Sequence, residues 1–303
     1  MSRTLRAVIV GDLRYNSEFI FGVHQGLTLL GHWATVMDVH SDIGAIAKKF
    51  KDVRPDVAFM HMLMWSPMGA KHTEDLLALC SSWRQRGTRI AIHDGDARVA
   101  TRHPHDVSFA VDLVLCNHTA DRSAWRVRCL RWPYFAFVQR EIAEPRPEFR
   151  CDLFFAGRQG GGIYADRTTL ISALKQRLGD RFRVYPTQEV PHTLFLTPEI
   201  AASATAVLGH GRSREEAPGW KDVRYWQYPG AGGVLLHDDV TGPLVPYDHF
   251  IPYAPGDVDS ILSGLEAAKS DGARIRRAAF RYVQERHTSV NRVGEALAAL
   301  GLA

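Results

Sequence analysis

The stretch Asp152–Arg167, D-L-F-F-A-G-R-Q-G-G-G-I-Y-A-D-R, decides the fold class of this chain. An apolar run with the character of a buried strand leads into a glycine-rich loop, and a helical pattern follows from Arg167 to Leu178. Glycines let backbone N–H groups approach a phosphate closely, and a helix N-terminus favours negative charge. The stretch therefore predicts a strand–loop–helix unit that can hold an anion, although a flexible surface loop would show the same pattern.

The same alternation of strand and helix extends in both directions along the chain. The predicted strands are Ala7–Val10, Ala34–Asp38, Val57–Met62, Arg89–Ile92, Leu113–Cys116, Asp152–Ala156, Phe182–Tyr185, Ala204–Gly209 and Val234–His237. The predicted helices are 17–30, Asp42–Lys51, Glu74–Arg86, Ala120–Arg126, Arg167–Leu178, Val258–Ala268, Ala273–Arg286 and a last one from about Ser289. Continuous apolar strands between amphipathic helices argue for parallel, doubly wound α/β sheets.

Composition describes an ordinary globular chain that divides into two parts. Of the 303 residues, 46% are apolar and 23% charged, and the net charge of +4 permits an anionic partner without requiring one. The proline-rich segment Glu144–Glu148 is the best linker. We expect domains over 1–143 and 150–285, and a C-terminal helix over 286–303 for which packing back on the first domain is one option.

The cysteines and the N-terminus suggest a reducing compartment. Cys80, Cys116, Cys129 and Cys151 form no C-x-x-C pair and are expected to be free thiols. The start of the chain lacks the pattern of a signal peptide, and no apolar run reaches the ~20 residues of a membrane span. We therefore expect a cytoplasmic protein.

A second glycine-rich stretch is Lys221–Asp238, K-D-V-R-Y-W-Q-Y-P-G-A-G-G-V-L-L-H-D. Here the glycines follow a short aromatic helix and precede a strand, which is the reverse of a dinucleotide fingerprint. They can let backbone approach a ligand, or they can form a helix stop and a packing turn. A nicotinamide dehydrogenase is disfavoured, because Gly11-Asp12-Leu13-Arg14 stands after the first strand where the fingerprint would lie.

Three ordered motifs in the second half resemble the CgeB-like, spore-maturation-type glycosyltransferases. The matching residues are Asp222, Arg224, Trp226, Gly232, Gly233 and Asp238, with F-F-A-G-R at 154–158 and E-R-H-T-S-V-N-R at 285–292. The resemblance implies a GT-B fold, in which two Rossmann-like doubly wound domains face each other across a cleft. It makes 1–143 the acceptor-side domain and 150–285 the domain that binds a nucleotide sugar.

The donor-binding residues that the resemblance and the glycine loop indicate are Gly157, Arg158, Gly160, Gly161, Gly162, Arg167, Arg224, Gln227, Gly230, Gly232 and Gly233. The arginines would grip a diphosphate bidentately and stabilise charge on the leaving group. Gln227 stands where the family usually has a glutamate that binds the donor ribose. The neutral side chain should weaken donor binding by about 1 kcal/mol, and it leaves room for a relative without catalytic activity.

The catalytic candidates lie at the ends of N-terminal strands. His93, Asp94 and Asp96 follow the fourth predicted strand, and Asp12 follows the first, so any of them could accept the proton of an acceptor hydroxyl. A polar strand-end turn is the simpler alternative. Asp94-x-Asp96 also resembles a metal-binding pair, but Asp257-x-Asp259 repeats it at a helix start, so we expect no metal site. A metal site at His103–Asp106 is disfavoured as well, because histidines on either side of a proline point apart.

The sequence thus predicts a glycosyltransferase that moves a sugar from a nucleotide-diphosphate sugar to a hydroxyl, with no cofactor and no required metal. The acceptor stays open, and a hydroxymethylated pyrimidine in DNA is one option. The basic run from Arg274 to Arg286 is a solvated helix face or part of a nucleic-acid footprint. The alternative is a degenerate relative that only binds a nucleotide sugar, or that serves in an assembly.

Overall fold

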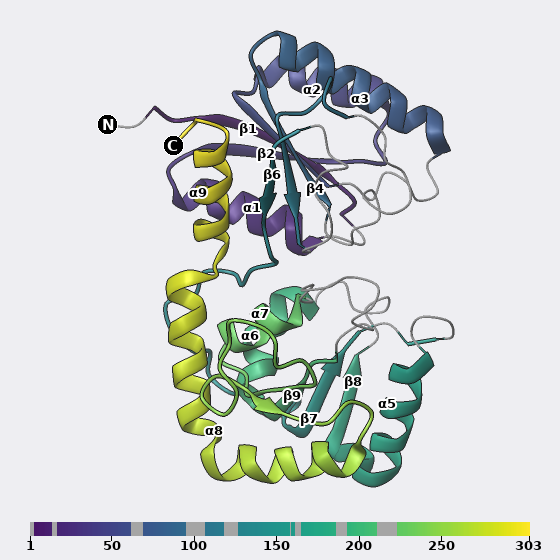
Figure 1. The fold of residues 1–303 in the computed structure, drawn as a ribbon, viewed down its shortest axis with the longest axis vertical. Helices are drawn as coiled ribbons and strands as arrows, with labels where there is room; N and C mark the ends of the chain where they lie inside the picture. Colours follow the sequence, from purple (N-terminus) through teal and green to yellow (C-terminus); the bar gives the residue numbers. More distant parts are fainter. Residues whose placement is uncertain are drawn as a thin grey trace. The chain divides into compact units, whose positions relative to one another are not determined.

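The computed structural model describes residues 3–13, 17–61, 69–94, 107–117, 127–157, 159–160, 165–185, 193–210 and 223–303. The chain divides into two compact units: unit 1 is Met1–Tyr134 with Ser289–Ala303, and unit 2 is Phe135–Thr288. Each unit is a parallel β-sheet with helices packed on it (Figure 1). This confirms the prediction of an α/β chain with two doubly wound, Rossmann-like domains. The predicted linker segment at 144–148 lies inside unit 2.

Unit 1 contains a six-stranded parallel sheet in the order β2-β1-β3-β4-β5-β6. Its strands are β1 (Arg6–Gly11), β2 (Trp33–Asp38), β3 (Val57–His61), β4 (Arg89–Asp94), β5 (Leu113–Cys116) and β6 (Cys129–Arg131). The chain order changes direction at β1, which has β2 on one side and β3 on the other. In open α/β sheets, ligands bind beyond the carboxyl ends of the strands at such a switch point.

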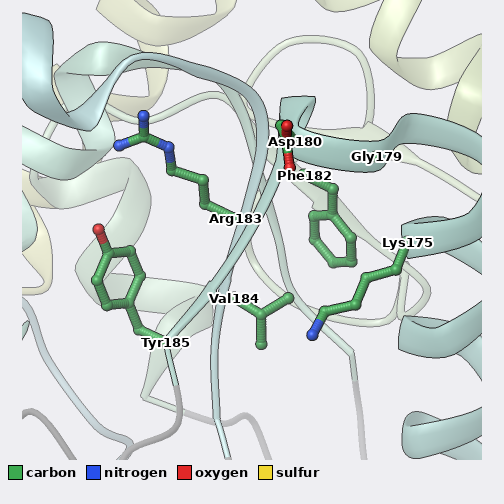
Figure 2. Close-up of a pocket in the computed structure, with 7 residues that line it drawn as sticks. All are labelled: Lys175, Gly179, Asp180, Phe182, Arg183, Val184 and Tyr185. Atoms are coloured by element: carbon green, nitrogen blue, oxygen red, sulfur yellow. The ribbon is translucent and has the colours of Figure 1, made fainter.

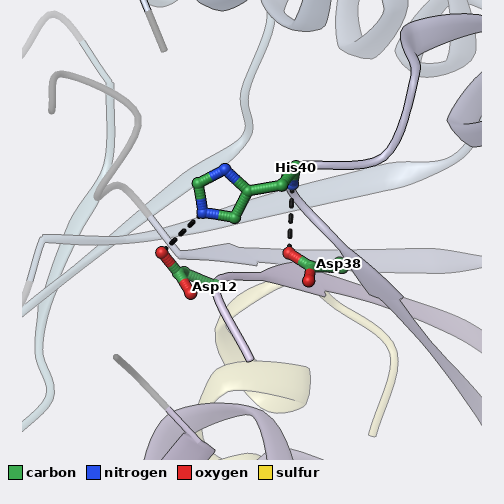
Figure 3. A group of neighbouring side chains, drawn as sticks. All are labelled: Asp12, Asp38 and His40. Atoms are coloured by element: carbon green, nitrogen blue, oxygen red, sulfur yellow. Dashed lines mark hydrogen bonds and ion pairs between the residues drawn. The ribbon is translucent and has the colours of Figure 1, made fainter. Parts of the chain in front are cut away.

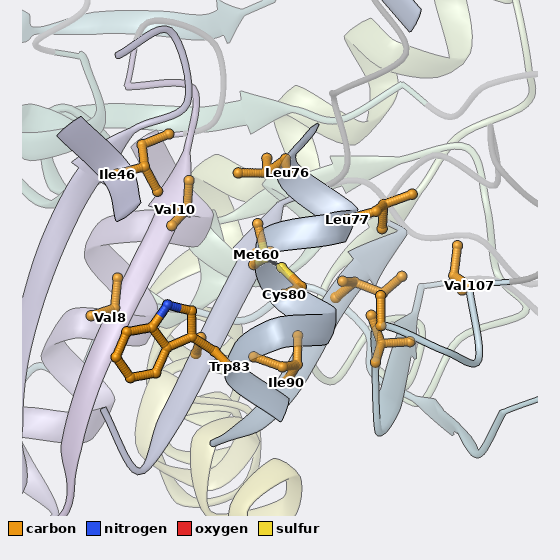
Figure 4. Packing of buried hydrophobic residues seen from close by; sticks show 14 of the residues in the cluster. Val8, Val10, Ile46, Met60, Leu76, Leu77, Cys80, Trp83, Ile90 and Val107 are labelled. Carbon is orange, nitrogen blue, oxygen red and sulfur yellow. Dashed lines mark hydrogen bonds between the residues drawn. The ribbon is translucent and has the colours of Figure 1, made fainter. Parts of the chain in front are cut away.

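The core of unit 1 forms because side chains alternate between the two faces of each strand. Figure 4 shows Val8 and Val10 of β1 on the face that is covered by α2 (Ile43–Val53) and α3 (Gly69–Gln85). Ile46 of α2 is wholly buried there, which stabilises the fold by about 1.5–3 kcal/mol. The opposite face is covered by α1 (Ser17–Leu29), whose buried side chains include Phe19 and Leu27.

Gly26 lets the last helix of the chain, α9 (Ser289–Ala299), lie directly on α1. A Cβ atom at residue 26 would fall 2.6 Å from the Ser289 carbonyl oxygen and 2.7 Å from Cγ2 of Val293. The Ser289 hydroxyl stabilises this contact by donating a hydrogen bond to Oε1 of Gln25 at 2.8 Å. The indole N–H of Trp132 also donates to the Arg292 carbonyl oxygen at 2.7 Å. The C-terminal helix therefore belongs to unit 1.

Replacing Gly26 with alanine should lower the free energy of unfolding by about 1–3 kcal/mol, because the added methyl group meets backbone that must move. Gly294 provides the matched control: it lies in α9, and a Cβ atom there would have nothing within 4 Å. Gly294→Ala should leave stability unchanged or raise it by up to about 1 kcal/mol through helix propensity. Urea unfolding followed by circular dichroism measures both, and equal stabilities would contradict the packing role of Gly26.

Unit 2 contains a five-stranded parallel sheet in the order β11-β10-β9-β7-β8. Its strands are β7 (Cys151–Ala156), β8 (Phe182–Tyr185), β9 (Ala204–Leu208), β10 (Leu235–His237) and β11 (Ile251–Pro252). Its helices are α5 (Ala165–Leu178), α6 (Thr193–Ser203), α7 (Arg224–Gly230) and α8 (Val258–Arg286), with short 3-10 turns at Pro147–Phe149 and Gly179–Arg181. The switch point of this sheet lies between β7 and β9, which pair with each other.

The prediction of two helices between residues 258 and 286 was wrong, because α8 is one continuous helix of 29 residues. It changes direction along its length (Figure 1). The Ser270 hydroxyl donates to the Ala267 carbonyl oxygen at 3.0 Å, a back-bond of the kind that bends helices. Gly272 is buried, and a Cβ atom there would lie 3.3 Å from Cγ2 of Val234, so this glycine is used for close packing and does not end the helix.

Three short or unusual elements were not predicted: β6, β11 and α6. The predicted helix at 120–126 lies outside the described residues. All four cysteines are described and are free thiols, as expected. Burial raises the pKa of the Cys80 thiol to about 12 and that of the Cys151 thiol to about 11, so both are protonated and poor nucleophiles at neutral pH. Among the described helices, none is long and apolar enough to cross a membrane.

Candidate functional site

The carboxyl ends of β7 and β9 meet at the switch point of the unit 2 sheet. Gly157 follows β7, and Gly209 and His210 follow β9. Both glycines are forced by close contacts: a Cβ atom at 157 would lie 2.7 Å from Cζ of Phe155, and one at 209 would lie 2.4 Å from Cδ2 of His237. Protein side chains therefore fill the space over both glycines, and the close packing at this edge is the reason for residues without a Cβ atom.

Two arginines converge on this edge from different helices. The guanidinium carbon of Arg224, at the start of α7, lies 5.4 Å from the centroid of the Phe155 ring, and that of Arg167, in the first turn of α5, lies 5.8 Å from it. Arg224 also donates to the Ala156 carbonyl oxygen at 3.0 Å, and Arg167 donates to the His210 carbonyl oxygen at 3.4 Å. Arg167 is buried and Arg224 half-buried.

The consequence is a concentration of positive charge at one point of the sheet edge. Two guanidinium groups on one ring in a partly desolvated setting attract an anion more strongly than exposed arginines do, because salt screens them less. Planar forks of this kind suit the oxygens of a phosphate or diphosphate. Both arginines were named from the sequence, and the structure brings them together at Phe155.

The glycine loop before α5 is only partly described. The Gly160 backbone N–H donates to the Thr168 hydroxyl at 2.8 Å, and that hydroxyl donates back to the Gly160 carbonyl oxygen at 2.9 Å. Gly160 has φ +146°, a conformation that favours glycine. Arg158, Gly161 and Gly162 lie outside the described residues, as does Asp222.

The glycines after α7 are packing positions. A Cβ atom at Gly230 would lie 2.3 Å from Cβ of Ala136, and one at Gly232 would lie 2.6 Å from Cγ2 of Ile142. Gly232 also has φ +83°, and Gly233 is closely surrounded as well. Protein atoms therefore fill the space over these three glycines, which fits the packing-turn alternative better than direct approach to a ligand. Gln227 lies in α7 and is 7% exposed.

A group that sequence reasoning missed lies beyond β9, β10 and β11. Nδ1 of His210 is 3.0 Å from Oδ2 of Asp238 and 3.2 Å from the hydroxyl oxygen of Tyr253. The Tyr253 hydroxyl donates to the Gly209 carbonyl oxygen at 2.9 Å, so it can only accept from His210. Nδ1 must then carry the proton, which leaves Nε2 as an acceptor in the neutral ring. The available signal was that polar residues directly follow predicted strands.

A shallow hollow of about 720 Å³ borders the outer strand β8, between that strand and the end of α5. Figure 2 shows Phe182, Val184 and Lys175 on one side of the strand, with Arg183 and Tyr185 on the other. A strand at the edge of a sheet commonly carries such charged side chains, which discourage pairing with another chain. We assign this hollow no chemistry.

Of the catalytic candidates in unit 1, His93 is fully buried. Its ring stacks on Phe19 with centroids 4.8 Å apart and lies edge-on to Trp132 at 5.3 Å. Asp94 is also buried, with 2% of its surface exposed, and Asp96 lies outside the described residues. In this arrangement His93 packs within an aromatic cluster, and its role as a general base stays a prediction.

Asp12 instead pairs with His40, a residue that sequence reasoning did not select. Figure 3 shows the two at the carboxyl ends of β1 and β2, with Nε2 of His40 2.7 Å from Oδ2 of Asp12. The His40 backbone N–H donates to Oδ1 of Asp38 at 3.0 Å. The His40 side chain is 27% exposed and that of Asp12 is 7% exposed. A carboxylate that accepts from Nε2–H orients the ring and leaves Nδ1 as the proton acceptor.

The same three residues could also hold a cation. Their ligand atoms lie within 4.8 Å of one another, and imidazole with two carboxylates suits a divalent metal. The short contact between His40 and Asp12 would have to open for both to bind one ion. The described geometry therefore fits a hydrogen-bonded pair better than a metal centre.

Solved structures with the same fold cover almost the whole chain. The lipopolysaccharide outer core galactosyltransferase WaaB, in its apo form, is similar with a TM-score of 0.53 and 11% identity over 98% of this chain and 99% of that one. AviGT4, a glycosyltransferase involved in avilamycin A biosynthesis, has a TM-score of 0.54 and 13% identity over 98% and 97%. A UDP-N-acetylglucosamine 2-epimerase has a TM-score of 0.50 and 12% identity over 100% and 98%.

These similarities show that the chain has the GT-B fold of glycosyltransferases. No protein-family model matches the sequence, and no curated protein is significantly similar to it. Since transferases and an epimerase share this fold, the reaction must be argued from the site itself.

Proposed function

We propose that this protein is a glycosyltransferase that moves a sugar from a nucleotide-diphosphate sugar to a hydroxyl acceptor. The observation that carries the proposal is the pair of arginines, Arg167 and Arg224, on Phe155 at the switch point of unit 2. A diphosphate is the anion that this paired positive charge suits best. The GT-B fold adds general support, because two of its similar structures are named glycosyltransferases.

In the proposed reaction the acceptor oxygen bonds to the anomeric carbon of the sugar, and the bond from that carbon to the diphosphate breaks. The nucleotide diphosphate leaves with the electron pair, and the hydroxyl proton passes to a base. The arginines stabilise the negative charge that grows on the leaving group, so the reaction has no requirement for a metal. Arg158 and the loop at 160–162 would add to this stabilisation.

The geometry favours His40 as the base over His93. His40 is partly exposed and is oriented by Asp12, which would also stabilise the imidazolium that forms, whereas His93 is enclosed by aromatic rings. In this proposal Asp12 is the residue that positions the base.

A screen of nucleotide sugars tests the function directly. We expect at least one nucleotide-diphosphate sugar to raise the melting temperature of the protein. The protein should also hydrolyse that nucleotide sugar slowly and release free nucleotide, because water can replace the acceptor. A thermal shift without release, even with candidate acceptors added, would favour the alternative of a nucleotide-sugar-binding protein without activity. The proposal would be overturned if no nucleotide sugar raised the melting temperature and no free nucleotide were released.

Membership of the CgeB-like family stays a prediction, and Gln227 offers a test of it. If this side chain binds the donor ribose, Gln227→Glu should tighten donor binding by about 1 kcal/mol, or roughly fivefold. Isothermal titration with the nucleotide diphosphate measures the change. Gln176→Glu introduces the same chemical change at an exposed position of α5 elsewhere in unit 2, and it should leave donor affinity unchanged. Weaker binding in Gln227→Glu would show that the buried position does not accept a carboxylate facing the ribose.

The acceptor is not identified by the site. A hydroxymethylated pyrimidine in DNA stays one option, and it requires a base that is exposed from the duplex and binding that weakens steeply with salt. A protein that is not retained on DNA at low salt would exclude this acceptor and leave the donor chemistry untouched.

A further inference from the structure

A second hollow, of about 310 Å³, lies in unit 2 and contains none of the residues assigned above to donor or base. Its walls come from the segment before β7 and from the C-terminal half of α8, and its lining residues are Gln139, Arg140, Ile142, Arg277, Phe280, Arg281, Gln284 and Glu285. We call it the arginine hollow. Its volume is at the lower end of the range for small-molecule pockets, so it suits a compact ligand.

The arginine hollow has a net positive charge, because three arginines and one carboxylate are among its described lining residues. Arg140, Arg277 and Arg281 are exposed, and none of them makes a hydrogen bond or ion pair with a described residue. Glu285 is the one carboxylate in the lining. Arg277 and Arg281 lie one turn apart on the same helix, where like charges destabilise by a few tenths of a kcal/mol.

The other arginines of α8 contact neighbouring groups, unlike Arg277 and Arg281. Arg274 forms ion pairs with Asp271 and Asp248, and Arg276 donates to the carbonyl oxygens of Ala202 and Ala204. The guanidinium carbon of Arg286 lies over the Tyr282 ring, 5.2 Å from its centroid. Of the arginines of α8, the two without such a partner are therefore the two that line the arginine hollow.

Gln284 links the two segments that line the arginine hollow. Its amide N–H groups donate to the carbonyl oxygens of Phe137, at 2.9 Å, and Gly230, at 2.7 Å, while its Oε1 accepts from the Gln139 backbone N–H at 2.9 Å. Gly230 is the last residue of α7, the helix that begins with Arg224. The hollow is therefore a preformed concave site, and it is connected to the helix that carries part of the proposed donor site.

We propose that the arginine hollow binds a small phosphate-bearing molecule. Arg140, Arg277 and Arg281 would bind the phosphate oxygens, because the guanidinium fork matches that geometry. Ile142 and Phe280, both half-buried, would contact an apolar or aromatic part of the same molecule. The site is distinct from the edge at Phe155, and the proposal does not depend on the transferase function.

Isothermal titration of the full chain with phenyl phosphate at low ionic strength tests the proposal. Arg277→Gln/Arg281→Gln should weaken the binding of phenyl phosphate at least tenfold. Arg140→Gln, at a residue that is not part of α8, should weaken it several-fold. The charge-matched control Lys48→Gln/Lys269→Gln removes two exposed lysines that lie elsewhere, and it should leave the affinity within twofold. Circular dichroism would show that all variants are folded.

The Arg224→Ala variant separates the two sites. It should keep its affinity for phenyl phosphate while losing affinity for a nucleotide diphosphate. Arg277→Gln/Arg281→Gln should lose affinity for phenyl phosphate and keep its affinity for a nucleotide diphosphate. Loss of phenyl phosphate binding only in Arg224→Ala, or equal binding in every variant, would overturn the proposal. Arginine-dependent binding of a short single-stranded oligonucleotide without binding of phenyl phosphate would show that the occupant is nucleic acid and would also overturn it.

Discussion

The Arg224→Ala variant is expected to lose about 2–5 kcal/mol of donor or transition-state binding, which is from about 30-fold to about 5,000-fold in kcat/KM. Arg224 is half-buried over the Phe155 ring and bonded to the Ala156 carbonyl oxygen, so its charge is fixed in place and little screened. Arg224→Lys keeps the charge but loses the planar guanidinium, so its kcat/KM should lie between that of the wild type and that of Arg224→Ala. Kinetics of nucleotide release and titration with the nucleotide diphosphate measure the loss.

Arg276 provides a matched control for the structural part of that loss. It is also half-buried in unit 2 and also donates to backbone carbonyl oxygens, those of Ala202 and Ala204, and burial lowers the pKa of its guanidinium. Arg276→Ala should therefore cost stability without a specific loss of donor binding. If both alanine variants lose donor affinity to the same extent, Arg224 supports the fold and does not bind the donor.

The second large effect is expected at His40. Removing a general base typically costs 10²–10⁴ in rate, so His40→Ala should lower kcat by about that factor while donor affinity stays within about twofold. Asp12→Asn should lower kcat by at least about tenfold, because the amide no longer selects the tautomer with its acceptor at Nδ1. Added imidazole should partly restore His40→Ala, a result that a purely structural role for this histidine does not predict.

His32 is the control for the histidine substitution. It lies in unit 1, its Nδ1 is 3.4 Å from the Leu5 backbone N–H, and burial lowers its pKa. His32→Ala should leave kcat unchanged. Activity that disappears with a chelator and returns with a divalent cation would assign Asp12, Asp38 and His40 to a metal centre, and unchanged kcat in His40→Ala would return the search for the base to Asp94 and Asp96.

Most of the fold was predictable because the strands are continuous apolar runs that end at polar residues. The exceptions have physical causes. With three and two residues, β6 and β11 are too short to show a period, and their pairing depends on neighbouring strands. Pro198 lies inside α6, where it argues against a helix in the sequence. Gly272 lies between the two predicted helices, but in the structure it is buried within α8, where a Cβ atom would lie 3.3 Å from Cγ2 of Val234.

Candidate residues for the site could be chosen from the sequence, but their geometry could not. Arg167 and Arg224 could be chosen from their motifs, whereas their meeting on Phe155 depends on how two helices return to the same strand. His40 and Asp12 are 28 residues apart, and only the pairing of β1 with β2 brings them together. His93 looked accessible because it ends a strand, but Phe19 and Trp132 come from distant parts of the chain to enclose it.

The position of α9 has a consequence for how this chain folds during its synthesis. Unit 1 is interrupted in the sequence by all of unit 2, and the helix that packs on Gly26 is made only after unit 2. At ordinary translation rates, roughly 10 to 30 s pass between the two segments of unit 1. Unit 2 can complete its sheet in that interval, while the apolar strip of α1 around Gly26 waits uncovered. A chaperone that captures nascent chains would therefore meet unit 1 in its unfinished state, although the strands of unit 1 are made before those of unit 2.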